Sequence, residues 1–148
     1  MVHRYERFAS SVSGINRCIQ KIEADVMEKH GLKGSYAQYL AALRRTENGL
    51  TVSQLSEICM KDKAAVSRAV AEMETKGLLE RLATGDNLYR AAIVLTDRGR
   101  EIAEYVANRA VSAVGCIGLD EQEIEKFYTA LDLIASNLRE VCKKGLPE

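Results

Sequence analysis

Donor side chains recur at helical spacing along the segment from residue 63 to residue 76. Lys63, Ser67, Arg68 and Lys76 share one polar face there, and each offers an N–H or O–H group. Such donors suit the phosphates and the base edges of DNA. We therefore expect this face to contact DNA; the alternative is an ordinary solvated helix face.

Capping residues predict the two helices that would position this face. Thr51 is a favourable N-cap, and Gln54 stands three residues later, where it completes a capping box. Asp62 can cap a second helix, which Gly77 would end in a left-handed conformation. The apolar positions of the two helices are Leu55 and Ile58, then Val66, Ala69, Val70 and Met73. Two short helices separated by about three or four residues fit a helix-turn-helix, whose second helix can enter a DNA major groove.

A β-hairpin is expected directly after the second helix. Residues 78–82 and 90–95 read as two strands, and the segment between them contains Gly85, Asp86 and Asn87, which favour a turn. The hairpin would form the wing of a winged helix-turn-helix.

Further helices are expected on both sides of this lobe. Residues 5–30 carry apolar side chains at steps of three or four, which predicts one long helix. Ser35 with Gln38 is another capping-box pattern, for a helix that should stop near Gly49.

Two more helices are predicted after the hairpin. Thr96 caps one that runs to Val114, and Asp120 with Glu123 opens another that continues until Gly145. The first helix and these last two carry more apolar surface than one winged helix can cover, so we expect a twofold homodimer. Twofold symmetry would place two recognition helices on successive major grooves of an inverted repeat.

The order of these motifs resembles one known family. The run LTVSQLSEICMKDKAAVSRAVAEMETKGLLER, followed by VLTDRGRE, is similar to the MarR family of bacterial winged-helix transcription regulators. The resemblance covers residues from about 35 to 105 and implies that Ser67 and Arg68 lie where the family's recognition helix commonly faces the groove. The family's wing usually carries an acidic residue followed by arginine near its tip. This chain has Asn87, Leu88 and Tyr89 there, with only Arg90 close by, which concerns the minor-groove contact and not the recognition helix.

Several other side chains are candidates for the DNA interface. Lys63 combines an ammonium with a helix N-terminus, which favours a phosphate. Arg81 and Arg90 flank the wing, although Arg81 can equally be structural and pair with an acidic residue such as Asp86 or Asp97. Capping explains Gln54 as well as a phosphate contact does. The expected set of DNA contacts is Ser53, Gln54, Lys61, Lys63, Ser67, Arg68, Lys76, Arg81 and Arg90.

Composition limits the remaining functional classes. The 148 residues suit one domain and hold 21 basic and 21 acidic side chains, with an acidic C-terminal third. Four cysteines without a CxxC pair and two histidines make a zinc site improbable. No signal peptide or long apolar stretch is evident, so we expect a cytoplasmic protein with no membrane association. GxSxG, HExxH and phosphate-binding glycine motifs are missing, so we expect neither an enzyme nor a bound cofactor.

The resemblance also implies regulation by a small ligand or, in some members of the family, by a cysteine near the first helix. A ligand held between the dimer region and the DNA-binding lobe would meet Arg17, His30, Tyr36, Tyr39 and Arg44. In the alternative, Cys18 senses oxidant beside Tyr36 and Tyr39, with Cys142 as a resolving partner, whereas Cys59 is expected in the core. Most free cysteines are simply small buried hydrophobes.

The sequence thus predicts a mainly α fold, a single MarR-like domain over residues 1–148. Residues 35–100 would form the winged-helix lobe with a two-stranded wing, and residues 1–34 and 101–148 a helical dimerisation region. The function expected is a homodimeric repressor of an inverted-repeat operator, released by a small-molecule effector. The alternatives are a thiol-based oxidant sensor that uses Cys18 and a winged-helix module for protein contact that does not bind DNA.

Overall fold

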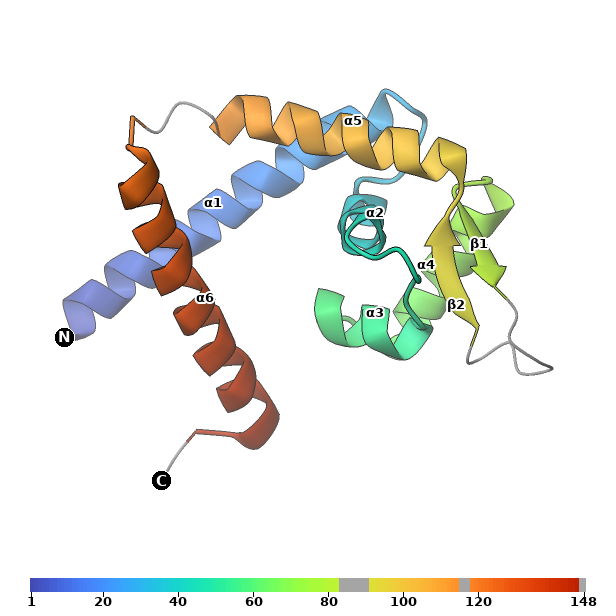
Figure 1. Cartoon of the computed structure of the whole chain (residues 1–148). Helices are drawn as coiled ribbons and strands as arrows, with labels where there is room; N and C mark the ends of the chain where they lie inside the picture. Colours follow the sequence, from blue (N-terminus) through green and yellow to red (C-terminus); the bar gives the residue numbers. More distant parts are fainter. Residues whose placement is uncertain (83–90, 115–117, 147–148) are drawn as a thin grey trace. The chain divides into compact units, whose positions relative to one another are not determined.

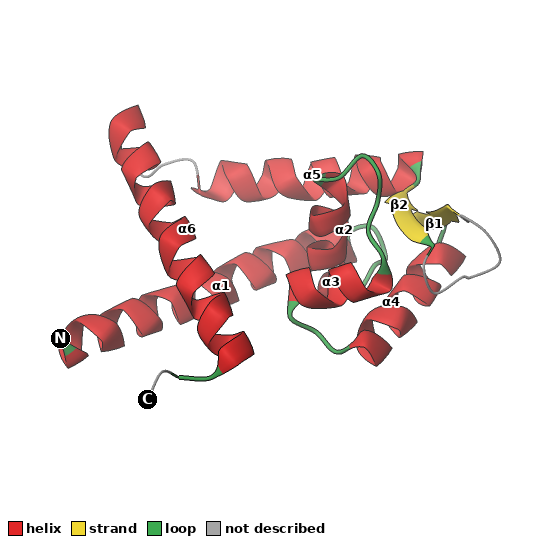
Figure 2. Ribbon diagram, turned by 60° about the horizontal axis from the view of Figure 1, so that its bottom comes forward, coloured by secondary structure: helices red, strands yellow, loops and turns green. Residues whose placement is uncertain are grey.

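The computed structural model describes residues 1–82, 91–114 and 118–146 and divides the chain into two compact units, Met1–Ala113 and Val114–Glu148 (Figure 1). The first unit contains α1 (Val2–Glu28), the 3-10 turn η1 (Gly34–Tyr36), α2 (Ala37–Arg44), α3 (Val52–Cys59), α4 (Lys63–Thr75), β1 (Leu79–Leu82), β2 (Ala92–Leu95) and α5 (Asp97–Val114), whose last residue belongs to the second unit. The second unit contains α6 (Glu121–Lys144). Figure 2 shows that helices dominate and that the strands form one small sheet, so the predicted mainly α winged-helix fold is confirmed.

Helix α2 lies at the centre of the first unit, where it contacts α1, α3 and β2 (Figure 1). Its Leu40 and Leu43 belong to one apolar core that also contains Leu55 of α3 and residues of α4, the strands and α5. The residues of α4 in this core are Val66, Val70 and Met73, and those of α5 are Ile102, Ala103 and Val106. The α4 residues are positions whose periodicity predicted burial, because a side chain every three or four residues covers one helix face.

The two helices of the helix-turn-helix begin at the predicted capping residues. Thr51 accepts a hydrogen bond from the backbone N–H of Gln54, and the Gln54 side chain accepts one from the backbone N–H of Thr51, completing the capping box. Asp62 accepts from the backbone N–H of Ala65 at the start of α4. Between the helices Met60 adopts the left-handed conformation, with φ 51° and ψ 46°, which turns the chain toward α4.

The end of α4 also follows the prediction. Gly77 has φ 70°, its N–H donates to the Glu74 carbonyl at 2.9 Å, and the Leu78 N–H donates to the Met73 carbonyl at 2.9 Å. This pair of bonds is a Schellman motif, which satisfies the last carbonyls of the helix. Strand β1 therefore begins at Leu79, one residue later than the sequence suggested.

Two predictions about α2 were wrong. Ser35 does not cap it: the helix follows η1, its N-cap residue Tyr36 makes no side-chain capping bond, and the Gln38 side chain instead donates to the Ser35 backbone carbonyl. The helix ends at Arg44 and not near Gly49. Gly49 has φ 74°, and a Cβ there would lie 2.4 Å from the Ile93 carbonyl oxygen, so this glycine serves a close backbone approach.

That approach adds a pairing the sequence did not predict. Leu50 forms an antiparallel bridge with Ile93, with N–O distances of 3.0 and 2.9 Å, next to the β1–β2 ladder. Ile58 also departs from expectation, since it is 56% exposed although it follows Leu55 by one helical step. Helix α3 has eight residues and packs on the core through Val52, Leu55 and Cys59, which leaves Ile58 outside this narrow stripe.

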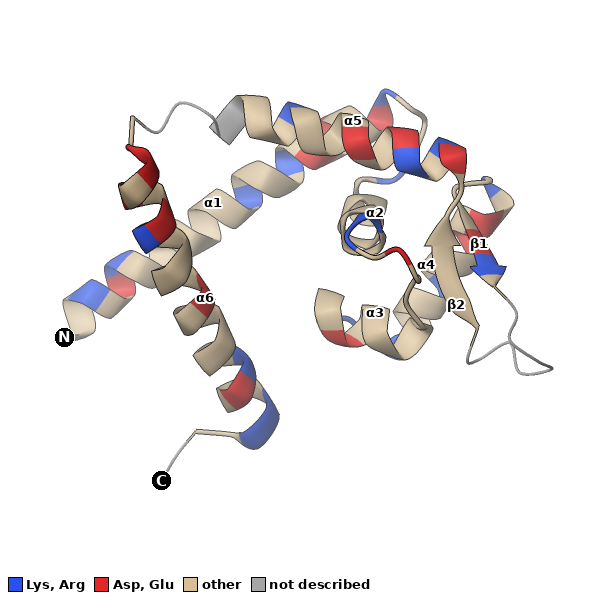
Figure 3. Cartoon of the chain, in the orientation of Figure 1, with Lys and Arg blue, Asp and Glu red and all other residues tan. Residues whose placement is uncertain are grey.

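Helix α6 begins with the predicted capping box of Asp120 and Glu123 and ends at Gly145, whose φ is 86°. Acidic side chains lie at its N-terminal end and basic ones at its C-terminal end, an order that complements the helix dipole (Figure 3). None of its residues is buried. Its exposed apolar residues include Phe127, Leu131, Ile134 and Leu138, at alternating steps of four, three and four.

The N-terminal part of α1 carries a similar exposed stripe. Tyr5, Val12, Ile15 and Ile19 are 36–67% exposed, whereas Val26 and Met27 near the end of the helix are buried in the core. Each of the two helices thus presents a regular apolar face.

Candidate nucleic-acid interface

The outward face of α4 presents the donors predicted to contact DNA. Lys63, Ser67 and Arg68 are exposed, whereas Val66 and Val70 on the opposite face are buried. Lys76, the C-cap residue, is exposed too. Because the apolar side of α4 packs in the core, these donor side chains point to the surface on the other side of the helix.

Both carboxylates of α4 are engaged by side chains from outside the helix. Lys33 donates to the Oε2 atom of Glu72 at 2.5 Å, and the hydroxyl of Tyr36 donates to the same oxygen. The Nε atom of Arg81 lies 3.0 Å from both carboxylate oxygens of Glu74. These contacts involve the only acidic side chains within α4.

The cations of α4 are consequently left available. Lys63, Arg68 and Lys76 form no ion pair with any residue in the described parts of the chain. A guanidinium or ammonium that has no internal partner can bind a phosphate or a guanine edge without first breaking a contact.

The segment that opens α5 fixes the C-terminal end of α4. The Thr96 N–H donates to the Leu78 carbonyl at 3.1 Å, the Thr96 hydroxyl to the Gly77 carbonyl at 2.7 Å, and Nη1 of Arg98 to the Lys76 carbonyl at 3.1 Å. Thr96 also caps α5 by accepting from the Gly99 N–H at 3.1 Å. A Cβ at position 99 would lie 2.0 Å from the Leu78 carbonyl oxygen, so only glycine permits this approach. Three successive carbonyls at the end of α4 are thus tied to the start of α5.

The N-terminal side of α4 carries the remaining predicted contacts. Lys61 is exposed in the turn, and its carbonyl accepts from the Ser56 hydroxyl at 2.5 Å, which fixes the turn against α3. Ser53 and Gln54 are exposed in the first turn of α3, where the Gln54 carboxamide oxygen is already used by the capping box.

The structure bears on the prediction for Arg81 but not on that for Arg90. Arg81 pairs with Glu74, an acidic residue that the sequence analysis did not consider, and this geometry favours the structural interpretation of Arg81. Arg90 and the predicted turn with Gly85, Asp86 and Asn87 lie outside the described residues.

Sequence reasoning did not assign Lys33, Tyr36 or Glu72 to this region. Thirty-nine residues separate Lys33 from Glu72, and no local periodicity links them. Tyr36 was predicted to meet a ligand, but its ring is buried at 1% exposure and its hydroxyl bonds Glu72. Burial is the largest cause of its raised pKa, and the hydrogen bond to Glu72 adds to it.

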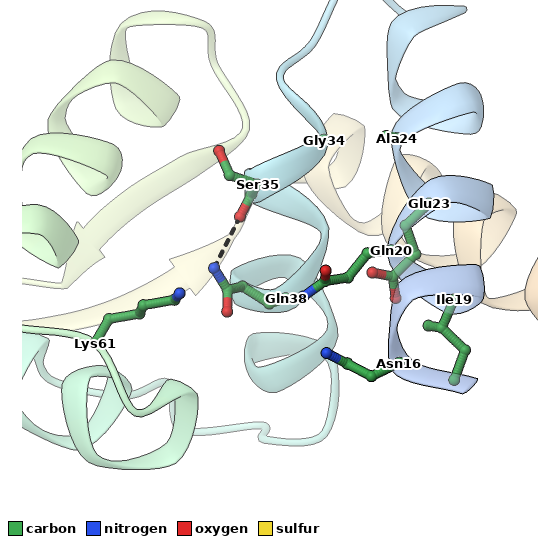
Figure 4. Close-up of a pocket in the computed structure, with 9 residues that line it drawn as sticks. All are labelled: Asn16, Ile19, Gln20, Glu23, Ala24, Gly34, Ser35, Gln38 and Lys61. Atoms are coloured by element: carbon green, nitrogen blue, oxygen red, sulfur yellow. Dashed lines mark hydrogen bonds between the residues drawn. The ribbon is translucent and has the colours of Figure 1, made fainter. Parts of the chain in front are cut away.

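A groove of about 540 Å³ lies between α1, the start of α2 and the turn before α4 (Figure 4). Asn16, Gln20 and Glu23 line it from α1, Ser35 and Gln38 from the opposite side, and Lys61 from the turn. Partial burial raises the pKa of Glu23. The groove thus presents three amide groups and one hydroxyl, carboxyl and ammonium group each, beside the apolar side chains of Ile19 and Ala24.

The five residues predicted to line a ligand cleft do not surround this groove. Tyr36 and Tyr39 are needed in the core and are nearly fully buried. The ring of His30 packs edge-on against Tyr105 with a centroid distance of 5.1 Å, and Arg17 and Arg44 are exposed. The resemblance alone did not separate tyrosines that face a cavity from tyrosines that fill the core.

The cysteines occupy different environments. Cys18 and Cys142 are exposed on α1 and α6, whereas Cys59 packs against the core as expected, and burial raises its pKa. In the described part of the chain Cys18 forms no hydrogen bond with Tyr36 or Tyr39. The redox role of Cys18 and Cys142 remains a prediction.

Comparison with known proteins finds similarity in the region of the helix-turn-helix. A sequence model described as "MarR family" matches residues 30–87, which include the helix-turn-helix. This matched segment is similar to the MarR family. No curated protein sequence matches the chain.

Solved MarR-type structures share the fold over most of the chain. A MarR family transcriptional regulator from Listeria monocytogenes, complexed with a 26-mer DNA, has a TM-score of 0.80 at 21% identity and covers 95% of this chain and 96% of its own. MarR from Staphylococcus aureus, in complex with salicylate and kanamycin, has a TM-score of 0.77 at 15% identity and covers 93% and 94%. The S. aureus MepR–DNA complex has a TM-score of 0.70 at 19% identity and covers 88% and 97%. At these identities the structures show a shared fold.

None of the described helices combines the length and the apolar composition needed to cross a bilayer.

Proposed function

We propose that this MarR-type chain is a sequence-specific DNA-binding transcription regulator that reads a major groove with α4. The observation that carries the proposal is the outward face of α4, where Lys63, Ser67 and Arg68 have no partner among the described residues while both carboxylates of the helix do. The firm anchoring of both helix ends supports it, since a reading helix must present its side chains in a fixed orientation. Two structures of the same fold were determined with DNA.

The regulator would act as a homodimer. Helix α6 buries no residue within the chain, and its apolar stripe repeats at alternating steps of three and four, the spacing of helices that pack side by side. The exposed stripe of α1 has the same spacing. A second copy of the chain supplies an apolar face of matching kind, so a twofold dimer would remove both stripes from water. Two copies of α4 would then read an inverted repeat.

We further propose that the chain is a repressor released by a small molecule. The groove beside α1 could hold such an effector: it adjoins both α1 and the turn before α4, so a ligand there could favour one arrangement of the two. A fold relative was determined with salicylate and kanamycin. The lining of this groove suits a polar ligand with several hydrogen-bonding groups. Such a regulator would work in the cytoplasm, where bacterial DNA is found, and no catalytic role is proposed.

The proposal is tested by selecting fragments of genomic DNA with the purified protein at low salt and measuring affinities for the enriched duplex. We expect an inverted repeat to be enriched. Arg68→Ala should weaken binding by about 1–3 kcal/mol if Arg68 reads a base, and Arg68→Lys should restore little of this. Arg109→Ala, which removes an exposed arginine from α5, is the matched control and should bind normally.

Failure to enrich any sequence would contradict the proposal. The alternative of a winged helix that contacts protein would then lead. Adding peroxide to the same selection tests the oxidant-sensing alternative, because enrichment should then vanish with the native protein and persist with Cys18→Ser.

A further inference from the structure

Arg68 and Glu72 stand four residues apart on α4, so their side chains are neighbours on the helix surface. Opposite charges at this spacing normally attract each other. The structure nevertheless shows no ion pair between them, and the Glu72 carboxylate is bonded to Lys33 and Tyr36. Glu72 therefore bonds Lys33 and Tyr36, which are distant in the sequence, in place of Arg68.

The two donors are held in place by the fold. The Tyr36 ring is 1% exposed, so its hydroxyl is aimed by the packing of the core. Gly34, between the two donors, approaches α1 so closely that a Cβ would lie 2.7 Å from the Cβ of Ala24. This contact pins the segment to α1. Lys33 has a flexible side chain that is 62% exposed, and it adds charge to the same oxygen.

The charge state of Glu72 fits this arrangement. The hydrogen bond from Lys33 is the largest cause that lowers the pKa of Glu72, followed by the bond from Tyr36, while Lys76 lowers it further from one turn along α4. The pKa of Tyr36 is raised, so its hydroxyl stays protonated and keeps donating. Glu72 is thus an ionised carboxylate that would attract Arg68 if it were released.

We propose that Lys33 and Tyr36 are positioning residues that hold Glu72 away from Arg68 and thereby keep the Arg68 guanidinium available to DNA. The inference rests on the proposed DNA-binding function and adds residues outside the helix-turn-helix to it. It also gives Glu72 a defined role: its negative charge on the reading helix is stabilised by Lys33 and Tyr36, which lie outside that helix.

The test compares binding of the inverted-repeat duplex from the selection by the native protein and three variants. Lys33→Met with Tyr36→Phe removes both donors and keeps the side-chain bulk. We expect it to bind about three- to tenfold more weakly, because a released i,i+4 pair is worth roughly twofold and the freed carboxylate also repels phosphates. Glu72→Gln alone should bind within twofold of the native protein or more tightly. Adding Glu72→Gln to the double variant should restore binding to within twofold of the native protein.

A purely structural role gives a different pattern. If the three side chains only stabilise the fold, Glu72→Gln should weaken binding as much as the double variant does, and combining them should rescue nothing. That result, or unchanged binding by the double variant, would overturn the inference while the native protein still binds DNA. Failure of the native protein to bind would instead refute the proposed function.

A second measurement needs no DNA. The pKa of Glu72, followed by carbon-13 NMR, should depend on Arg68 only when Lys33 and Tyr36 are replaced. Arg68→Ala should therefore raise it in the double variant and leave it unchanged in the native background. Equal responses in both backgrounds would contradict the inference.

Discussion

Replacing Gly99 by alanine tests how the end of α4 is anchored, and the expected sign is opposite to that of helix propensity. Alanine normally stabilises an exposed helix position by about 1 kcal/mol relative to glycine. At position 99 a Cβ would lie 2.0 Å from the Leu78 carbonyl oxygen and 2.9 Å from its carbon, both backbone atoms. These atoms would have to separate by more than about 1 Å to reach ordinary contact.

Such a shift would break the two bonds that Thr96 makes to the carbonyls of Leu78 and Gly77. Each is worth about 1 kcal/mol, and a buried carbonyl left without a partner adds about 1–3 kcal/mol. Subtracting the gain in helix propensity leaves a net loss of about 2–4 kcal/mol in the free energy of unfolding. DNA affinity should fall as well, because the end of α4 loses its anchor.

The assay is urea unfolding followed by circular dichroism at one fixed protein concentration. Gly99→Ala should lower the midpoint by about 1 M or more. Gly14→Ala is the matched control: Gly14 lies inside α1, no atom outside the backbone of its own helix comes within 4 Å of its added Cβ, and stability should rise by up to about 1 kcal/mol. A Gly99→Ala midpoint equal to or above that of the native protein would refute the close-approach argument.

Three further predictions concern single side chains. Met60→Gly should raise the free energy of unfolding by up to about 1 kcal/mol in urea unfolding, because Met60 is a non-glycine residue at φ 51°; a less stable variant would contradict the strain. Since the folded-state pKa of Glu72 is lowered, chiefly by Lys33, its contribution to stability is present above about pH 4.5 and is lost as the pH falls through the lowered value. Glu72→Gln should therefore lose less stability than the native protein in acid titration, and identical acid profiles would argue against the interaction. Burial raises the pKa of Cys59, so peptide mass mapping should show it reacting with iodoacetamide at least about tenfold more slowly than exposed Cys18; equal rates would contradict the burial.

Helix starts were predictable because capping is a local interaction. Thr51, Asp62 and Asp120 each bond a backbone N–H within three residues, so their sequence context contains the whole interaction. Gly77 was predictable for the same reason, as a residue that tolerates positive φ at a helix end.

Features that depend on distant segments were not predictable. Ser35 has the capping-box pattern but lies within a 3-10 turn, whose close packing on α1 at Gly34 sets the backbone there. The Leu50–Ile93 bridge joins segments 43 residues apart, and the bond from Lys33 to Glu72 spans 39. No periodicity in the sequence reports contacts of this kind.

The candidate DNA site shows the same division. The exposure of Lys63, Ser67 and Arg68 followed from the apolar stripe on the other side of α4. The sequence did not predict which cations form ion pairs. The structure shows that Arg81 pairs with Glu74, while Arg68 pairs with neither carboxylate of its own helix.

The most direct test of the account is the DNA selection with native protein and Arg68→Ala in parallel, followed by affinity measurements over a range of salt concentrations. The account predicts that the native protein enriches an inverted repeat and that Arg68→Ala loses discrimination at specific positions of each half-site. It also predicts a nearly unchanged salt dependence if Arg68 reads a base. Equal affinity of the two proteins for the same duplex at low and high salt, or no enrichment by the native protein, would contradict the central claim.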